Sequence, residues 1–344
     1  MNPSQANART LSVVVPVYRS RETLDELYRR LRNALVALAG EFEIIFVEDC
    51  GGDDSWSVIR RLVDSDPRVR GIRLSRNYGQ HNALLCGIRE AKYEVVVTLD
   101  DDLQNPPEEI RRLLLKLDEG YDVVYGTPAR EHHGVFRDLA SQITKFVLQN
   151  AMGASTARRV SAFRVLRTHV RNAFAGYRGP FVSIDVLLTW GTTRFAYVIV
   201  AHDFRAAGKS NYTVRKLITH ALNMMTGFST GPLQLASIVG FTFTLVGFAA
   251  LAYVLGVYIV HGGSVPGFAF LASMIAIFAG AQLFALGIIG EYLARMHFRS
   301  MDRPPYVVLD DAVSAACGSA THPDIANSQE PTADREPIGR FRDP

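Results

Sequence analysis

Apolar and polar residues alternate through residues 11–210 in blocks that predict strands and helices in turn. Apolar runs at 11–17, 42–47, 69–74, 94–99 and 123–125 are typical of buried strands. Between these runs, residues 23–38, 55–63, 80–89 and 108–117 carry apolar side chains at helical spacing. This alternation predicts an α/β domain with a mainly parallel sheet and helices on its faces.

Two long apolar stretches follow this domain, at residues 233–260 and 268–290, and neither contains Asp, Glu, Lys or Arg. A helix of about 20 apolar residues spans the hydrocarbon core of a bilayer. We therefore expect residues 231–294 to form a hairpin of two transmembrane helices. Residues 211–230 also carry apolar side chains at helical spacing, beside Arg215 and Lys216. This pattern predicts a helix in the membrane interface, with a core-packing helix as the alternative.

The distribution of charge sets the expected orientation and excludes some classes of protein. Basic residues flank the hairpin on both sides, whereas its connector at 261–267 has no Lys or Arg. The positive-inside rule then places both ends of the hairpin, the large domain and a return segment at 295–310 in the cytoplasm. The net charge of +3 is too small to indicate a nucleic-acid-binding protein. The three cysteines are scattered, so their spacing predicts neither a set of disulfides nor a zinc site. Residues 1–10 are read as a flexible start without a cleavable signal peptide, and 311–344 as a disordered tail.

The most informative motif is the acidic run that ends the fourth apolar strand. Asp100, Asp101 and Asp102 follow Leu99 directly, and Gln104 comes two residues later. Adjacent carboxylates repel one another unless a positive partner meets them. Oxygen ligands of this kind suit Mg²⁺ or Mn²⁺, which typically bridge carboxylates to the phosphates of a substrate. The alternative is an acidic loop exposed to solvent.

Two further predicted strands also end in residues that could bind a ligand. The first predicted strand ends in Pro16 and Tyr18, and the second ends in Glu48 and Asp49, with Asp53 close behind. Ligands of parallel sheets bind beyond the carboxyl ends of the strands, so these groups are expected to converge in one crevice. The sequence has neither a GxGxxG nor a P-loop motif. An acidic crevice beside a membrane hairpin favours a nucleoside-diphosphate ligand held through a metal ion.

Several motifs then strengthen this interpretation by occurring in a fixed order. They are the Pro16 and Tyr18 pair, Glu48-Asp49 with Asp53, NYGQH at 77–81, DxDxQNPPE at 100–108, RxxGxSxY at 205–212, GIIGEY at 287–292 and Arg303-Pro304. The set resembles the polyisoprenyl-phosphate glycosyltransferases of family 2, across roughly residues 11–307. This group includes bactoprenol glucosyltransferase, undecaprenyl-phosphate aminoarabinose transferase and dolichyl-phosphate mannose synthase. The resemblance implies a GT-A fold, which is Rossmann-like, over residues 11–210.

The resemblance also implies roles for individual residues. Metal binding falls to Asp100, Asp102 and Gln104, with Mg²⁺ or Mn²⁺ as the cofactor. Catalysis is assigned to Asp100, Asp102, Arg130, Arg137 and Arg205. The nucleotide-sugar site is assigned to Pro16, Tyr18, Glu48, Asp49, Asp53, Gln80, Asp100, Asp101 and Ser210.

The sequence departs from the family pattern in several places. Arg19 and Ser20 follow the first strand where an Asn-Glu pair is usual, with Glu22 as a possible substitute. Glu48 stands where an Asp is usual, and Asn211 replaces the usual Lys of an SKY motif. The run before Phe163, ARRVSA, lacks the usual Asp and Gly, so the position offers no acidic catalytic base. Farther along the chain, we read Asp185 as a carboxylate on a helix surface and leave Trp190 open between the core and the acceptor side.

The expected function is transfer of a sugar from a nucleotide-sugar, with UDP favoured, to an undecaprenyl-type phosphate, with inversion. A phosphate acceptor is already an anion near neutral pH because its second pKa is about 6, so no base is required. The resemblance further implies a multi-pass protein of the bacterial cytoplasmic membrane, a homo-oligomer, with no nucleic-acid partner. The alternatives are a processive polysaccharide synthase, whose QxxRW element is absent, and an inactive membrane scaffold.

Overall fold

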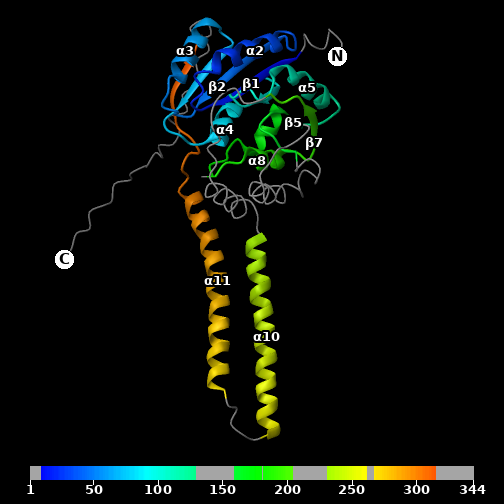
Figure 1. Ribbon diagram of the computed structural model, residues 1–344, viewed down its shortest axis with the longest axis vertical. Coiled ribbons are helices and arrows are strands. Elements are labelled where there is room, and N and C mark those ends of the chain that lie inside the picture. The colour runs from blue at the N-terminus through cyan, green and yellow to red at the C-terminus, as the bar shows by residue number, and fades with distance from the viewer. Residues whose placement is uncertain (1–8, 129–158, 180, 204–230, 262–266, 315–344) are drawn as a thin grey trace, which may run out of the picture.

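The computed structural model describes residues 9–128, 159–179, 181–203, 231–261 and 267–314 (Figure 1). They form an α/β domain followed by a hairpin of two long helices, after which the chain returns to the domain. The expected interfacial helix at 211–230 lies outside the described residues, as do Arg130, Arg137, Arg205 and Ser210.

One sheet organises the domain, in the order β7-β5-β6-β4-β1-β2-β3-β8. The central strands β4, β1, β2 and β3 are parallel, whereas β6 and β8 run antiparallel to their neighbours. The strands are β1 (Thr10–Val17), β2 (Glu41–Glu48), β3 (Val69–Leu74), β4 (Val95–Thr98), β5 (Val123–Pro128), β6 (Arg164–Arg167), β7 (Phe195–Val200) and β8 (Val308–Val313). The structure therefore confirms the mainly parallel sheet and adds three strands that the sequence pattern did not predict.

Two layers of helices cover the sheet. The helices of the domain are α2 (Leu24–Val36), α3 (Ser55–Ser65), α4 (Gln80–Glu90), α5 (Ile110–Asp118) and α8 (Ile184–Gly191), with short 3-10 helices at Pro107–Glu109 and Thr168–Phe174. One core cluster joins α2, α3 and α5 to the sheet, and a second joins α4, the 168–174 helix and α8 to the opposite face. In Figure 1 the second layer lies on the side of the hairpin.

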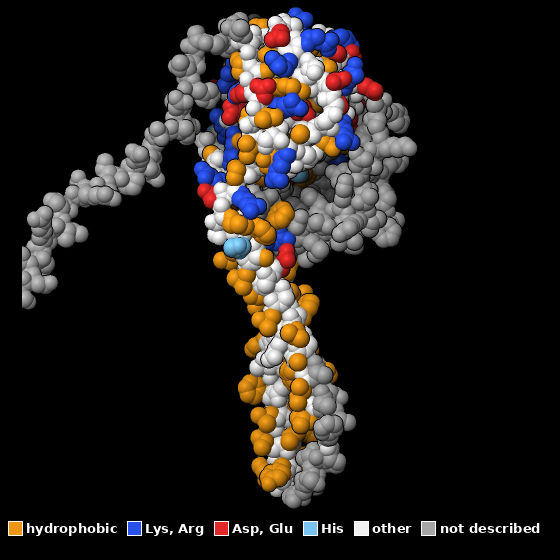
Figure 2. All heavy atoms as spheres, turned by 90° about the vertical axis from the view of Figure 1, so that its left-hand side faces the viewer, with side chains coloured by type: hydrophobic (Ala, Val, Ile, Leu, Met, Phe, Trp, Pro, Cys, Tyr) orange, Lys and Arg blue, Asp and Glu red, His pale blue; other side chains and the backbone are white. Residues whose placement is uncertain are grey.

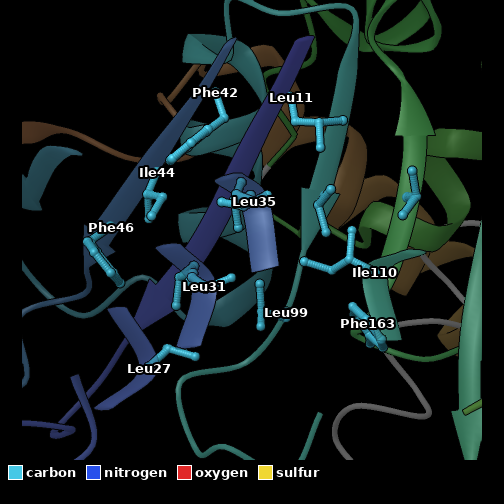
Figure 3. Packing of buried hydrophobic residues seen from close by; sticks show 14 of the residues in the cluster. Leu11, Leu27, Leu31, Leu35, Phe42, Ile44, Phe46, Leu99, Ile110 and Phe163 are labelled. Carbon is cyan, nitrogen blue, oxygen red and sulfur yellow. The ribbon is translucent and has the colours of Figure 1, made fainter. Parts of the chain in front are cut away.

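The first core shows why these sequences form their elements. Leu27, Leu31 and Leu35 recur at helical spacing on α2 and are fully buried. Figure 3 shows their side chains in one cluster with Leu11, Ile44 and Leu99. Strand β1 is buried on both faces because alternate side chains enter the two cores, with Val13 in one and Val14 in the other. A central parallel strand of this kind brings its carboxyl end to the middle of one sheet edge.

The two helices after the domain are α10 (Gly231–His261) and α11 (Phe268–Ser300). Both are long and apolar enough to cross a membrane. Each is longer than its predicted apolar span, and α11 runs on into the predicted return segment. Strand β8 follows, pairs with β3 and forms that edge of the sheet. Residues 311–313, which the sequence analysis assigned to a tail, belong to β8, and residues 315–344 lie outside the described residues.

Candidate active site

A cleft of about 270 Å³ opens at the carboxyl ends of β1, β2 and β4. These strands are neighbours in the sheet, so the residues that follow them meet at one edge. The lining consists of Pro16, Val17, Tyr18, Asp49, Asn77, Gly79, Gln80, Asp100, Asp101 and Asp102. Seven of the residues predicted for the site therefore converge here: Pro16, Tyr18, Asp49, Gln80, Asp100, Asp101 and Asp102.

All three aspartates of the acidic run line the cleft, and a tight turn follows them. Asp100 Oδ1 accepts a hydrogen bond from Gln80 Nε2 at 2.5 Å, and Asp102 Oδ1 accepts one from the Gln104 backbone N–H at 3.1 Å. Leu103 has a positive φ of 62°, and its side chain is buried in the first core cluster. The left-handed backbone at Leu103 turns the chain directly after the three aspartates, and the Leu103 side chain enters the core.

Asp101 is held differently from its two neighbours. Its carboxylate accepts hydrogen bonds from the Tyr18 backbone N–H at 3.0 Å and from the Ser20 hydroxyl. Its own carbonyl accepts one from Thr23 Oγ1 at 2.7 Å. Burial raises the pKa of Asp101 while the Ser20 and Tyr18 bonds oppose that rise. These contacts make Asp101 an anchor that joins the turn after β1 to the acidic turn after β4.

Asp49 lines the cleft at the end of β2 and orders the start of α4. Its two carboxylate oxygens accept the backbone N–H groups of Tyr78, at 2.7 Å, and Gly79, at 2.8 Å. Burial raises the pKa of Asp49, and the two N–H donors limit the rise. By fixing this turn, Asp49 places Gln80, the first residue of α4, beside Asp100.

Glu48 and Asp53, predicted to contact the nucleotide-sugar, do not line the cleft. Glu48 is 1% exposed and accepts hydrogen bonds from Gly51 N–H at 2.6 Å and from Arg73 Nε at 3.1 Å. The longer arm of Glu48 thus links the turn after β2 to β3. Asp53 accepts hydrogen bonds from the Ser55 hydroxyl at 2.7 Å and from the Ser55 backbone N–H at 3.3 Å, so it supports the start of α3.

Gln104, the third predicted metal ligand, also does not line the cleft. Its backbone N–H donates to Asp102, and its carbonyl accepts a hydrogen bond from Asp203 N–H at 2.9 Å. In this structure Gln104 shapes the acidic turn through its main chain.

Backbone strain is concentrated at this edge of the sheet. Among the described residues, four non-glycine residues have a positive φ, and three of them are Arg19, Cys50 and Leu103, which follow β1, β2 and β4. Each such residue costs on the order of 1–3 kcal/mol and persists only where the surrounding contacts require it. The turns after β1 and β2 are also tied together, because Arg19 Nε donates to the Gly51 carbonyl at 2.9 Å. The edge is held in one shape, as a preformed binding site requires.

The carboxylate oxygens in the cleft fit a metal ion that also binds a substrate. Among the described residues, no group of three or more His, Cys, Asp or Glu side chains could hold a metal by itself. Asp100 and Asp102 supply carboxylate oxygens from one turn, and Mg²⁺ is commonly bound by one or two carboxylates together with substrate phosphates. The cleft therefore suits a cation completed by a phosphorylated ligand.

Sequence reasoning missed some residues of this region and misread another. Asn77 lines the cleft, and Ser20 holds Asp101; neither was assigned a role. The prediction of Asp185 as a surface carboxylate is wrong, because Asp185 is 8% exposed and pairs with the buried Arg164 and the Tyr125 hydroxyl. Because aspartate is charged, the sequence favoured a solvent-exposed position for Asp185. Its partner Arg164 comes close to it only in the folded structure.

The fold is an α/β domain whose cleft opens at the carboxyl ends of parallel strands, the place where domains of this kind bind their ligands. Residues 12–181 match the family described as glycosyl transferase family 2. The chain is 34% identical over 301 residues to the undecaprenyl-phosphate 4-deoxy-4-formamido-L-arabinose transferase of Pseudomonas syringae pv. syringae, covering 87% of this chain and 89% of that protein. It is 33% identical over 303 residues to the protein of the same name from Klebsiella pneumoniae, covering 87% and 93%.

Among solved structures, the chain is similar to glucosyl-3-phosphoglycerate synthase from Mycobacterium tuberculosis in complex with Mn²⁺ and UDP-glucose. That match has 17% identity and a TM-score of 0.48, and it covers 65% of this chain and 79% of the other. The family match and the two relatives settle the class: the chain belongs to glycosyl transferase family 2. The predicted GT-A fold and the predicted enzyme class, glycosyltransferase, are confirmed.

Proposed function

We propose that this glycosyltransferase moves a sugar from a nucleotide-sugar, which we take to be a UDP-sugar, to an undecaprenyl-type phosphate at the cytoplasmic face of a bacterial membrane. The observation that carries the proposal is the cleft in which Asp100 and Asp102 meet, in a domain attached to two helices long enough to cross a bilayer. The relatives named undecaprenyl-phosphate transferases support the acceptor, since they align with 87% of this chain at 33–34% identity.

Asp100 and Asp102 are the residues that would hold Mg²⁺ or Mn²⁺ against the donor diphosphate. When bound, the ion would stabilise the negative charge that develops on the leaving nucleoside diphosphate. Gln80 holds the carboxylate of Asp100 in place, and Asp101 fixes the turn on which both acids lie. Pro16 and Tyr18 line the same cleft beside them and remain our candidates for the nucleotide.

The reaction itself needs little from a general base. A phosphate oxygen of the acceptor forms a bond to the anomeric carbon, while the bond from that carbon to the donor diphosphate breaks. The acceptor is an anion near neutral pH, so no proton has to be removed. A single displacement of this kind inverts the anomeric configuration. Arg130, Arg137, Arg205 and Ser210 keep their proposed roles at the donor and acceptor phosphates, on family resemblance alone.

The distribution of basic residues supports the cytoplasmic face. Arg295, Arg299 and Arg303 lie at the domain end of α11, whereas the connector sequence at 261–267 has no Lys or Arg. By the positive-inside rule, the domain end of the hairpin faces the cytoplasm, where nucleotide-sugars are available.

The test uses the purified full-length protein with undecaprenyl phosphate, Mn²⁺ or Mg²⁺, and a panel of UDP- and GDP-sugars. We expect one donor to give a lipid-linked monosaccharide and an equal amount of nucleoside diphosphate, both abolished by EDTA. Asp102→Asn should remove this activity, whereas the surface variant Asp25→Asn should retain it. Release of nucleoside diphosphate without the lipid, or formation of a polymer, would contradict the proposal.

A further inference from the structure

A second cavity, of about 410 Å³, lies where the domain meets the end of α11. It shares no lining residue with the active-site cleft. Its lining is Ala173, Phe174, Gly176, Tyr177, Arg178, Gly179, Trp190, Arg299 and Asp302. The cavity thus draws on the helix at 168–174 and the turn after it, on α8 and on the membrane hairpin, and it belongs to the helical layer on the hairpin side of the sheet.

Side-chain contacts fix the end of α11 at this cavity. The Tyr177 hydroxyl donates to the Phe181 carbonyl at 2.6 Å and also contacts the Arg299 guanidinium. One turn earlier on α11, Arg295 lies over the Phe181 ring at 4.8 Å from its centroid. These contacts hold the cavity walls together, so the cavity is a built feature of the junction between domain and hairpin.

The cavity lies at the level of the membrane surface. The apolar exterior of α11 continues beyond its predicted span, since Leu293, Met296 and Phe298 are 57%, 67% and 45% exposed. Figure 2 shows hydrophobic side chains along the hairpin up to the base of the domain, where Lys and Arg side chains begin. Trp190 is half exposed and meets Tyr177 edge to face, with ring centroids 5.6 Å apart. Trp and Tyr rings at such a level are typical of the headgroup region.

The charges at the cavity favour an anion. Arg178 and Arg299 both line it, and Arg299 has no carboxylate partner within the part of the chain that the structure describes. Arg178 pairs with Asp302 at 2.7 Å, but both side chains are more than 60% exposed, and an exposed pair of this kind is weak and opens readily. Guanidinium groups bind phosphate oxygens through paired hydrogen bonds.

We propose that this cavity binds the phosphate headgroup of an anionic membrane phospholipid, with Arg178 and Arg299 on the phosphate and Trp190 beside the glycerol region. The proposal rests on the membrane location inferred above. A phospholipid fits the position because the cavity opens at headgroup level, away from the catalytic cleft. Bound there, the lipid would join α8 to α11 and help to set the height of the domain above the bilayer.

The two tryptophans of the chain allow a direct test. Trp56 is buried in the first core, and Trp190 borders the cavity. In a Trp56→Phe background, the full-length protein is reconstituted into phosphatidylcholine vesicles that contain small, equal fractions of brominated phosphatidylglycerol or brominated phosphatidylcholine. Bromine quenches a nearby indole, so the fluorescence of Trp190 reports which lipid occupies the cavity. Co-flotation of protein with vesicles checks membrane insertion separately.

We expect brominated phosphatidylglycerol to quench Trp190 at much lower fractions than brominated phosphatidylcholine. In the double variant Arg178→Gln/Arg299→Gln, the preference for phosphatidylglycerol over phosphatidylcholine should fall by roughly tenfold, because each basic residue near the surface adds to anionic-lipid binding. The matched control Arg61→Gln, an exposed arginine on α3, should keep the preference.

Equal quenching by both lipids in floated vesicles would overturn the headgroup site while leaving the proposed function intact. Retention of the preference in the double variant would also overturn it. Restoration of Trp190 fluorescence by a stoichiometric amount of undecaprenyl phosphate would contradict the phospholipid assignment and point to the acceptor instead. Failure to float with vesicles would count against the membrane location, and therefore against both proposals.

Discussion

At the scale of single residues, the acids around the cleft divide into two groups by what their carboxylates contact. Asp49, Asp101 and Glu48 accept backbone N–H or hydroxyl donors from neighbouring turns, so they shape the site. Asp100 and Asp102 instead accept hydrogen bonds from Gln80 and Gln104, and they belong to the turn after β4 that Asp101 ties to the turn after β1. The sequence indicates all of these positions, because each lies at or just after the end of an apolar strand. It cannot assign the two roles, since Asp49 and Asp101 bond to segments that are distant in the sequence and that only the fold brings to them.

The contact between Gln80 and Asp100 gives a prediction about metal affinity. Replacing Gln80 with Ala removes the hydrogen bond that orients the Asp100 carboxylate. Loss of a group that orients a metal ligand typically weakens metal binding by about 10–100-fold. We expect Gln80→Ala to raise the Mn²⁺ concentration needed for half-maximal activity by this order, with a smaller loss of kcat at saturating Mn²⁺. An unchanged Mn²⁺ dependence would mean that Gln80 does not position the ligand.

A second residue-scale prediction concerns stability and pH at Asp66. This buried carboxylate accepts hydrogen bonds from Arg68 Nε at 2.9 Å and from the Tyr28 hydroxyl at 2.8 Å. The Arg68 hydrogen bonds lower the pKa of Asp66 to about 2, below its ordinary 3.8. The carboxylate therefore stabilises the fold above pH 3.8, and this contribution is lost as pH falls toward 2.

Asp66→Asn should lower the free energy of unfolding at pH 7 by about 1–3 kcal/mol, the usual cost of losing hydrogen bonds to a charged group. Thermal unfolding of both proteins from pH 7 to pH 2 measures the difference. We expect the two melting temperatures to converge below pH 4. If the difference between the two melting temperatures stays constant from pH 7 to pH 2, the lost stability comes from packing and not from the charge of Asp66.

At the scale of elements, the alternating pattern predicted the first five strands and the four helices between them, because each pairs a buried face with regular spacing. Of the three strands that it missed, β7 does carry an apolar run, FAYVIV, which was not predicted as a strand, whereas β6 and β8 lack this signal. Strand β6 has four residues and begins and ends with arginine, of which Arg164 is buried only because Asp185 meets it. Strand β8 has an exposed, acidic sequence and is held by its partner β3. Local patterns cannot reveal pairing between residues this far apart in the chain.

Strand β8 returns the chain from the hairpin of α10 and α11 to the α/β domain. Arg70 on β3 contacts Asp311 on β8 and Glu90 at the end of α4, the latter at 2.9 Å. Tyr306, just before β8, packs on the second core cluster. Removing residues 306–344 should therefore expose the edge of β3 and lower the melting temperature by several degrees, since a loss of 1 kcal/mol shifts it by about 2–4 °C in proteins of 150–250 residues.

The matched control is removal of residues 315–344, which keeps β8 and should leave the melting temperature unchanged. Differential scanning fluorimetry of the two truncated proteins in the same detergent makes the comparison. Equal melting temperatures for both would show that β8 does not stabilise the domain.

At the scale of the whole molecule, one helical layer of the domain lies toward the hairpin (Figure 1). The cleft opens at the carboxyl edge of the sheet. A glycosyltransferase built in this way can hold a soluble nucleotide-sugar in the cleft while its acceptor stays in the bilayer. The central claim is that Asp100 and Asp102 hold a divalent cation against the diphosphate of that donor. Every other proposed role depends on the position of this ion.

The most direct test is the binding of Mn²⁺ to the full-length protein, measured by electron paramagnetic resonance with and without UDP. Our account predicts that UDP tightens Mn²⁺ binding in the wild type and in the surface variant Asp25→Asn. The Asp102→Asn variant should still insert into membranes, but it should lose the tight binding of Mn²⁺ that UDP induces in the wild type. Equal Mn²⁺ affinity in Asp102→Asn and the wild type, with UDP present, would contradict it.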